Sequence, residues 1–287
     1  MNGIVIIDKP QDWTSQDVTA RLRRVYGTRR IGHGGTLDPM ATGVLPVFVG
    51  RATRGVEFFE HARKEYVTLL RPGLITDTQD TTGTVLETHP VSLDEGKIAQ
   101  VLEQFRGDIM QIPPMYSALK VNGQKLCDLA RKGRTVERQP RPITIHALEY
   151  LGMENGCLKL RVDCSKGTYI RTLCEDIGRA LGCGGCMEAL RRTKAGEYDI
   201  SQAVPLQVLL DSETPVQYLR PVDSMFTACP AVKLTPNQEK RCRNGNAFSV
   251  AIADGTYRAY SQTGEFLMLA RVTGGVMETV KSFFEVE

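Results

Sequence analysis

The sequence predicts an α+β protein in which a mixed, largely antiparallel sheet with flanking helices is followed by a small C-terminal β-barrel-like domain. Short apolar runs typical of strands, such as residues 3–8, alternate with amphipathic helical repeats over the first two-thirds of the chain. Residues 223–287 differ, because strand-like runs there are separated by Asp-Gly, Thr-Gly and Gly-Gly turns. With 287 residues, 41% of them hydrophobic, the chain can bury a sizeable core.

Bulk composition narrows the class of protein. The net charge of +3 and the pI near 8.4 are mildly basic and compatible with a nucleic-acid partner. No apolar run approaches the length of a membrane span, and the N-terminus lacks the pattern of a signal peptide. Eight cysteines are scattered without a disulfide-like framework, as expected for reduced thiols. We therefore expect a cytoplasmic protein.

The chain is expected to begin with a buried strand and an amphipathic helix. Residues 3–8 form the apolar run, and Thr14 and Asp17 have the spacing of a variant capping box. The helix that follows would bury Val18, Leu22 and Val25. Its polar side and the residues just beyond it are basic, which indicates either a solvated surface or a phosphate contact; they are Arg21, Arg23, Arg24, Arg29 and Arg30.

A glycine-rich stretch at residues 31–54 is the centre of the sequence. Four glycines surround Asp38 before an apolar, strand-like segment at residues 44–49. Asp38 precedes Pro39, which biases it toward an extended or turn conformation. A carboxylate fixed on a tight turn beside a buried strand can serve as a nucleophile or base, whereas Asp before Pro can also simply cap a turn.

The middle of the chain supplies the remaining sheet and helices. Residues 65–71 form a strand that carries Tyr66, and Asp77–Thr81 reads as a polar loop rather than a metal site. A second capping box at residues 92–95 precedes a helix with an apolar stripe of Ile98, Val101, Leu102 and Phe105. Residues 143–151 and 158–164 are strands joined by a Glu-Asn-Gly turn, and a helix opens at residues 165–171 and stops near Gly182.

One segment is strongly basic. Residues 115–145 hold seven basic side chains against Asp128 and Glu137, a local charge of +5 in a chain that totals +3. Such a one-sided excess predicts a surface that follows a phosphate backbone, the alternative being a solvated loop. The seven are Lys120, Lys125, Arg131, Lys132, Arg134, Arg138 and Arg141.

Six ordered motifs resemble the TruB family of bacterial tRNA pseudouridine synthases. The central one is Gly32-His-Gly-Gly-Thr-Leu-Asp38-Pro-Met-Ala-Thr-Gly43. The resemblance implies the pseudouridine synthase fold in residues 1–222, with a basic insertion at about 112–145 that clamps the tRNA arm, and a PUA-type RNA-binding domain at 223–287. It also implies isomerisation of uridine 55 in the TΨC loop of tRNA. The other motifs lie around Asn2–Gln11, Lys64-Glu-Tyr66, Pro113–Lys120, Cys164–Arg171 and Leu190-Arg-Arg192.

The resemblance also assigns roles to single residues. Asp38 would attack either uracil C6 or ribose C1′, Arg171 would pair with Asp38, and Tyr66 would stack on the target base. Tyr66 is also a candidate to remove the C5 proton, although a phenol with a pKa near its reference value of about 10 needs help to do so. The expected substrate-binding residues are Lys9, His33, Tyr66, Tyr169, Leu190, Arg131, Lys132 and Arg134.

No cofactor and no metal are expected. Cys183 and Cys186 have the spacing of half a zinc or redox site, but the sequence offers no second pair to complete it. The expected partner is the TΨC arm of tRNA, bound by a monomer without a protein partner or a membrane. Two other classes fit less well: a non-catalytic RNA-binding protein would not need Asp38, and an aspartate-nucleophile hydrolase should carry further acids or metal ligands.

Overall fold

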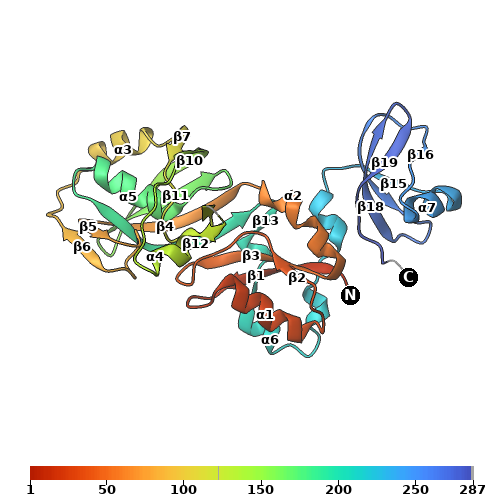
Figure 1. Cartoon of the computed structure of the whole chain (residues 1–287), viewed down its shortest axis with the longest axis horizontal. Coiled ribbons are helices and arrows are strands. Elements are labelled where there is room, and N and C mark those ends of the chain that lie inside the picture. The colour runs from red at the N-terminus through yellow and green to blue at the C-terminus, as the bar shows by residue number, and fades with distance from the viewer. Residues whose placement is uncertain (122, 286–287) are drawn as a thin grey trace. The chain divides into compact units, whose positions relative to one another are not determined.

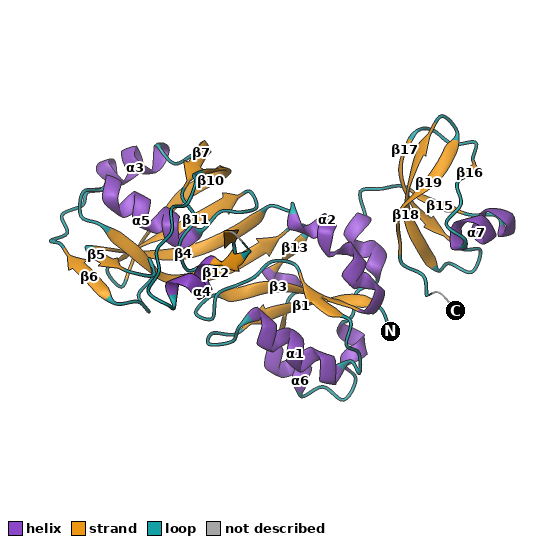
Figure 2. Cartoon of the chain, in the orientation of Figure 1, coloured by secondary structure: helices purple, strands orange, loops and turns teal. Residues whose placement is uncertain are grey.

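The computed structural model describes residues 1–121 and 123–285, whose helices and strands are drawn in Figures 1 and 2. These residues form two compact units. The first unit consists of Met1–Pro39, Val44–Glu60 and the chain from Ser201 onward. The second consists of Met40–Gly43 and His61–Ile200. Both units mix helices with strands, so the predicted α+β class is confirmed.

In the first unit, apolar strands form a small buried sheet. Strand β1 (Gly3–Lys9) runs parallel to β14 (Val204–Pro205) and neighbours β3 (Thr42–Val49). Strand β2 (Ile31–His33) is antiparallel to β3. The four isoleucine and valine side chains of β1 are at most 1% exposed, as the apolar run predicted. The helical elements are η1 (Gly50–Gly55), α2 (Val56–Glu60), η2 (Ile200–Gln202), α6 (Leu206–Leu210), η3 (Pro215–Tyr218) and η4 (Val222–Phe226).

Helix α1 (Ser15–Val25) begins where its sequence signals place it. The Thr14 hydroxyl accepts a hydrogen bond from the Asp17 amide (3.0 Å), and the Asp17 carboxylate accepts one from the Thr14 amide (3.0 Å). The predicted capping box is therefore confirmed. Val18 and Leu22 are fully buried, which places the basic side of the helix toward solvent.

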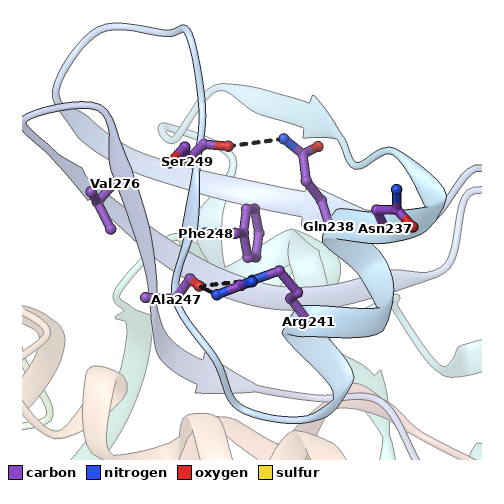
Figure 3. A pocket seen from close by; sticks show the side chains of 7 residues that line it. All are labelled: Asn237, Gln238, Arg241, Ala247, Phe248, Ser249 and Val276. Carbon is purple, nitrogen blue, oxygen red and sulfur yellow. Dashed lines mark hydrogen bonds between the residues drawn. The ribbon is translucent and has the colours of Figure 1, made fainter.

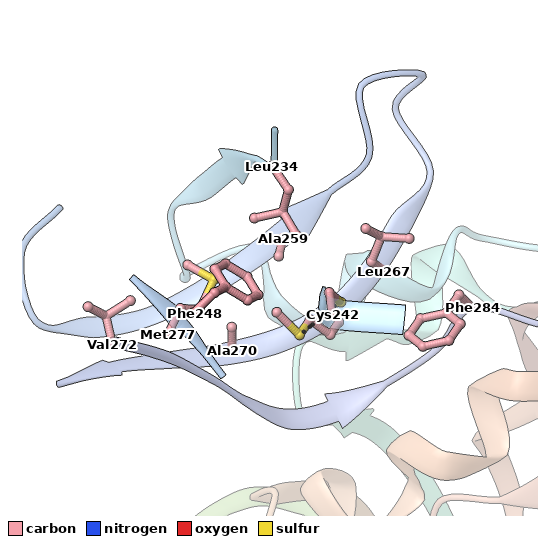
Figure 4. Close-up of a cluster of buried hydrophobic side chains, with 10 residues drawn as sticks. Leu234, Cys242, Phe248, Ala259, Leu267, Ala270, Val272, Met277 and Phe284 are labelled. Carbon is pink, nitrogen blue, oxygen red and sulfur yellow. Dashed lines mark hydrogen bonds between the residues drawn. The ribbon is translucent and has the colours of Figure 1, made fainter. Parts of the chain in front are cut away.

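The end of the first unit is a curled sheet with the strand order β15-β17-β18-β19-β16. Ten buried side chains, among them Phe248 and Met277, form its core (Figure 4). The strands are β15 (Ala231–Lys233), β16 (Phe248–Ser249), β17 (Gly255–Tyr260), β18 (Phe266–Thr273) and β19 (Val276–Ser282).

Two details of this C-terminal region differ from the prediction. Helix α7 (Pro236–Arg243) was not expected in an all-β region, and the strand predicted at residues 247–253 is only the two-residue β16. Of the residues of α7, only Cys242 is buried, so the helix lacks the apolar stripe on which a periodicity argument depends. Its beginning is nevertheless encoded, because Thr235 and Gln238 form a capping box with Pro236 in the first turn.

This sheet is joined to the segment η1–α2 within the first unit. The Arg51 Nε lies 3.0 Å from a Glu285 carboxylate oxygen, and Lys281 pairs with Glu57. The Phe226 ring contacts the rings of Phe58, Phe266 and Phe283, with centroids 5.4–6.2 Å apart. Burial of large aromatic rings makes this a hydrophobic joint with ion pairs at its rim.

The second unit carries an antiparallel sheet in the order β7-β10-β11-β4-β12 (Figure 1). Strand β12 also pairs in parallel with Thr42 and Gly43 of β3, so the sheet is mixed and largely antiparallel, as predicted. The strands are β4 (Lys64–Pro72), β7 (Gly107–Gln111), β10 (Arg141–Glu154), β11 (Cys157–Cys164), β12 (Gly185–Ala195) and β13 (Tyr198–Asp199), with the two small hairpins β5 (Leu74–Thr76)–β6 (Val85–Thr88) and β8 (Lys120–Val121)–β9 (Gln124–Lys125).

The helices of this unit are α3 (Glu95–Glu103), α4 (Leu126–Ala130) and α5 (Ile170–Ala180). The cap predicted for α3 is wrong: Asp94, not Ser92, accepts the Lys97 amide (2.8 Å). Asp94 directly precedes the first residue of the helix, so its carboxylate, rather than the Ser92 hydroxyl, is placed to accept the Lys97 amide. The stop of α5 is confirmed, since Gly182 has a φ of +83° just after the C-cap.

Candidate active site

The motif loop that holds Asp38 lies between β2 and β3 and has no regular structure of its own. Asp38 is half-buried, whereas the preceding Leu37 is 3% exposed. The Leu37 amide donates to the Ser15 hydroxyl (2.9 Å), and the same hydroxyl donates to the Leu37 carbonyl (3.1 Å). On the other side of Asp38, the Pro39 carbonyl accepts the Asp12 amide (2.8 Å). The backbone on both sides of Asp38 is therefore fixed.

Lys9, at the end of β1, is buried beneath this loop. Its Nζ donates to the carbonyls of Pro10 (2.9 Å), Trp13 (2.5 Å) and Pro39 (3.2 Å), and the residue is 0% exposed. Hydrogen bonds from a charged donor are strong, so they compensate for the cost of burying an ammonium group. If Lys9 contributes to substrate binding, it therefore does so by holding the motif loop.

His33 is the last residue of β2 and is half-buried. Its Nε2 lies 3.4 Å from the Gln16 amide nitrogen on α1. The glycine beside it leaves no room for a side chain, because a Cβ on Gly34 would lie 2.5 Å from the Phe59 ring. The ring of His33 is thus presented by a tightly packed turn. Its predicted contact with the substrate stays a prediction.

In the second unit, Tyr66 and Leu190 share one face of the sheet. Tyr66 on β4 lies opposite Arg192 on β12, and Thr68 lies opposite Leu190. Opposed residues share a face, and so do residues two apart on a strand, so these four side chains point the same way. Thr68 Oγ1 is 3.9 Å from the Cys174 sulfur of α5, which places α5 on that face.

Tyr169 directly precedes α5 and Arg171 lies in its first turn. The Gln111 side chain, 2% exposed, donates to the Tyr169 carbonyl (3.1 Å) and accepts its amide (2.8 Å). Arg171, 7% exposed, donates to the carbonyls of Thr78 (3.2 Å) and Tyr116 (2.8 Å). Gln111 was missed from the sequence, because a glutamine between apolar residues carries no motif.

A buried carboxylate also lies beside Arg171. Asp80 Oδ2 is 3.8 Å from the Arg171 Nε, and Asp80 is 5% exposed. Its Oδ1 accepts the Thr82 amide (3.0 Å) and the Thr78 hydroxyl (2.8 Å), which confirms that this segment is a loop. The sequence placed Asp80 in a polar loop but did not predict its contact with Arg171. Among the described residues no group of three or more His, Cys, Asp or Glu side chains could hold a metal ion.

The predicted site residues therefore fall into two sets. Lys9, His33 and Asp38 lie together in the first unit, around the motif loop. In the second unit, Tyr66 and Leu190 lie on the face of β4 and β12 against which α5 packs, and Tyr169 and Arg171 lie at the start of α5. The first set offers a carboxylate, and the second offers a buried aromatic ring, apolar contacts and a guanidinium group. A carboxylate nucleophile and a binding site for a planar base need these groups.

The basic segment around α4 is exposed. Arg131, Lys132 and Arg134 are all exposed side chains, and Arg131 has one carboxylate neighbour, Asp128, at 3.8 Å. Leu126 and Leu129 anchor α4 by their burial. The segment thus presents charge to solvent on a short, anchored helix and the loop that follows it.

The cysteines, all of them among the described residues, form no disulfide bonds. All eight are free, and Cys183 and Cys186 are buried. Burial raises the pKa of the Cys186 thiol to about 11 and that of Cys174 to about 12. Such thiols are almost entirely protonated and unreactive at neutral pH.

Comparisons with known proteins identify the class to which this fold and these residues belong. Residues 23–170 match the family described as "TruB family pseudouridylate synthase (N terminal domain)", and residues 171–227 match "tRNA pseudouridylate synthase B C-terminal domain". The chain belongs to the TruB family of pseudouridylate synthases. It is an enzyme that isomerises uridine to pseudouridine in tRNA.

Individual relatives and solved structures agree with this assignment. The chain is 40% identical to tRNA pseudouridine synthase B of Clostridium kluyveri, over 99% of this chain and 100% of that protein. It is 43% identical to the protein of the same name from Aromatoleum aromaticum, over 96% and 90% of the two chains. A solved "Cbf5-Nop10-Gar1 Complex" contains a chain of similar fold, with a TM-score of 0.74, 27% identity and coverage of 98% and 85%.

Proposed function

We propose that this enzyme acts on uridine 55 in the TΨC loop of tRNA and that the Asp38 carboxylate is the nucleophile on a flipped-out nucleotide. The observation that carries the proposal is the anchoring of the loop on both sides of Asp38, by Ser15 at Leu37 and by Lys9 and Asp12 at Pro39. Asp38 itself is only half-buried. A fixed backbone around a reachable carboxylate suits attack on either uracil C6 or ribose C1′.

The residues of the second unit have complementary roles in this proposal. The role that we propose for Arg171 is to pair with Asp38 and orient its carboxylate, in addition to its contact with Asp80 (3.8 Å). Tyr66 stacks on the extruded uracil and is the candidate base for the C5 proton, while Tyr169 and Leu190 line the uracil pocket. His33 fills the space that the flipped nucleotide leaves. The arrangement is supported by the side chains of Tyr66 and Leu190, which lie on one sheet face, the face against which α5 packs.

Two exposed basic surfaces support binding of a tRNA arm. Arg131, Lys132 and Arg134 would contact phosphates of the TΨC arm from the insertion at residues 112–145. The outer side of α1 and the turn beyond it add five more exposed arginines, and arginine suits phosphate geometry better than lysine. These are Arg21, Arg23, Arg24, Arg29 and Arg30.

We further propose that residues 1–222 are catalytic and that residues 223–287 form a PUA-like RNA-binding domain. An open pocket of about 340 Å³ between α7 and β16 supports the second assignment (Figure 3). Gln238 donates to the Ser249 carbonyl (3.1 Å) and Arg241 to the Ala247 carbonyl (2.8 Å), on either side of the Phe248 ring. Amide and guanidinium groups that line an open pocket can donate hydrogen bonds to a nucleobase edge or a phosphate.

The proposed enzyme works as a monomer in the cytoplasm, where its tRNA substrate is, and needs no protein partner. The proposal that it works as a monomer is supported by the fact that one chain supplies both the candidate catalytic residues and the basic surfaces. In the described part of the chain, no helix is long and apolar enough to cross a membrane.

Mapping the product tests the proposal. Unmodified tRNA transcript is incubated with the enzyme, and pseudouridine is located by carbodiimide-dependent primer stops. One new stop at uridine 55 is expected, and a transcript with cytidine at position 55 should give none. Asp38→Asn, nearly isosteric but uncharged, should bind tRNA normally and form no product. Modification at another position would refute the site, and turnover near that of the wild type would remove Asp38 from the mechanism.

A further inference from the structure

The Ser15 hydroxyl makes an unusual pair of contacts with the motif loop. It accepts a hydrogen bond from the Leu37 amide (2.9 Å) and donates one to the Leu37 carbonyl (3.1 Å). A serine hydroxyl has one donor and two acceptor sites, so it can satisfy both backbone groups of one residue. Ser15 thus replaces the strand partner that Leu37 lacks in this irregular loop.

Both contact residues are buried. Ser15 is 1% exposed and Leu37 is 3% exposed, so water cannot readily replace the hydroxyl if it is lost. Ser15 itself is fixed as the first residue of α1, directly after the Thr14 cap. The first residue of α1 therefore fixes the position of Leu37, the residue that directly precedes Asp38.

We propose that Ser15 is a positioning residue for the isomerisation, which holds the backbone before Asp38 so that the carboxylate keeps its reactive placement. The inference rests on the proposed role of Asp38. Ser15 acts through Leu37 and is not itself catalytic. A displacement of about 1 Å at a reacting group can cost about 100-fold in rate, so loss of the hydroxyl should affect the rate more than the affinity.

The test compares Ser15→Ala with Thr19→Val. Thr19 is a matched control, because it is also 1% exposed on α1, but its hydroxyl donates to the Gln16 carbonyl (2.9 Å) within the helix. Single-turnover rates at saturating tRNA and Kd for tRNA are measured for both. We expect Ser15→Ala to lower the rate roughly 10- to 100-fold with Kd changed less than about twofold, and Thr19→Val to stay near wild type.

Amide hydrogen exchange provides a readout independent of activity. The peptide that covers residues 31–42 should exchange faster in Ser15→Ala, because the Leu37 amide loses its acceptor, and should be unchanged in Thr19→Val. If Ser15→Ala does not fold, Ser15→Cys keeps the size while weakening the hydrogen bonds, and the same two changes are expected in it. If neither folds, Ser15 serves global stability and the inference is overturned.

The remaining outcomes separate this inference from the proposed function. An unchanged rate in Ser15→Ala overturns the positioning role, as does an equal loss in Thr19→Val or a rate loss without faster exchange at residues 31–42. Asp38→Asn is assayed in parallel. If Asp38→Asn stays active, the nucleophile assignment fails, and the inference fails with it. If it is inactive while Ser15→Ala is normal, only the inference fails.

Discussion

Replacing Gly43 with alanine probes how closely β3 approaches β12. Gly43 has a φ of +100° and pairs with Arg192 of β12. An added Cβ would lie 2.2 Å from the Arg192 carbonyl oxygen and 2.9 Å from its amide nitrogen. Neither atom belongs to a flexible side chain, so the strands themselves would have to separate.

The magnitude has two parts. A non-glycine residue forced to a positive φ of this kind costs about 1–3 kcal/mol. Insertion of an atom into a closely packed site costs about a further 1–3 kcal/mol. Gly43→Ala should therefore lower the free energy of unfolding by about 2–6 kcal/mol, enough to lower the unfolding midpoint visibly.

Gly152 in β10 isolates the first part, the backbone cost. Its φ is +105°, yet an added Cβ would meet nothing within 4 Å. Gly152→Ala should therefore show only the backbone cost of about 1–3 kcal/mol. Urea unfolding of both variants is followed by far-UV circular dichroism, which reports both units. Single-turnover activity should fall in Gly43→Ala, five residues beyond Asp38, and persist in Gly152→Ala. A urea midpoint for Gly43→Ala no lower than that of Gly152→Ala would refute the close approach.

Three further predictions concern the substrate and the thiols. If the Tyr66 phenol removes the C5 proton, Tyr66→Phe should bind tRNA but release tritium from C5-labelled uridine about 10²–10⁴-fold more slowly. Tyr66→Leu should in addition lose base stacking worth about 1–3 kcal/mol. A Phe variant as fast as the wild type would leave Tyr66 with a stacking role alone. Replacing Arg131, Lys132 and Arg134 with alanine should weaken tRNA binding and flatten the slope of the logarithm of the binding constant against the logarithm of the salt concentration by up to roughly three units. The single-turnover rate at saturating tRNA should change little. An unaltered slope would mean that these side chains are only solvated and do not contact phosphates. Cys174 is 0% exposed, and burial raises the pKa of its thiol to about 12, so iodoacetamide at pH 8 should leave it unmodified in the native enzyme and label it only after unfolding in urea; rapid labelling of the native enzyme at pH 8 would contradict its burial.

The sequence predicted those elements whose signals are local. The capping box of Thr14 and Asp17 placed the start of α1, and apolar runs placed β1 and β4, because burial follows periodicity directly. Helix α7 was missed since only Cys242 is buried in it. The cap of α3 was misplaced by two residues, because both Ser92 and Asp94 are good caps and only geometry decides between them.

The candidate site was predictable in its motif residues but not in their support. Asp38 could be predicted because several glycines lie close to it in the sequence. Ser15 does not, because it reads as an ordinary first residue of a capped helix until the fold places its hydroxyl against Leu37. Gln111 likewise gains its role only when β7 meets the start of α5. Supporting contacts between residues distant in sequence depend on tertiary structure, which a local pattern does not contain.

The first unit is assembled from both ends of the chain, and this has a consequence for its synthesis. Ile7 of β1 pairs with Val204, and the Ile4 amide donates to the Arg220 carbonyl (2.9 Å). At about 5–20 residues per second, a ribosome needs on the order of ten seconds or more to make the intervening chain. During that interval β1 has an unpaired edge. The loop of Asp38 is translated before residues 204–220, which complete its unit, so we expect nascent chains to acquire catalytic competence only after those residues have left the ribosome.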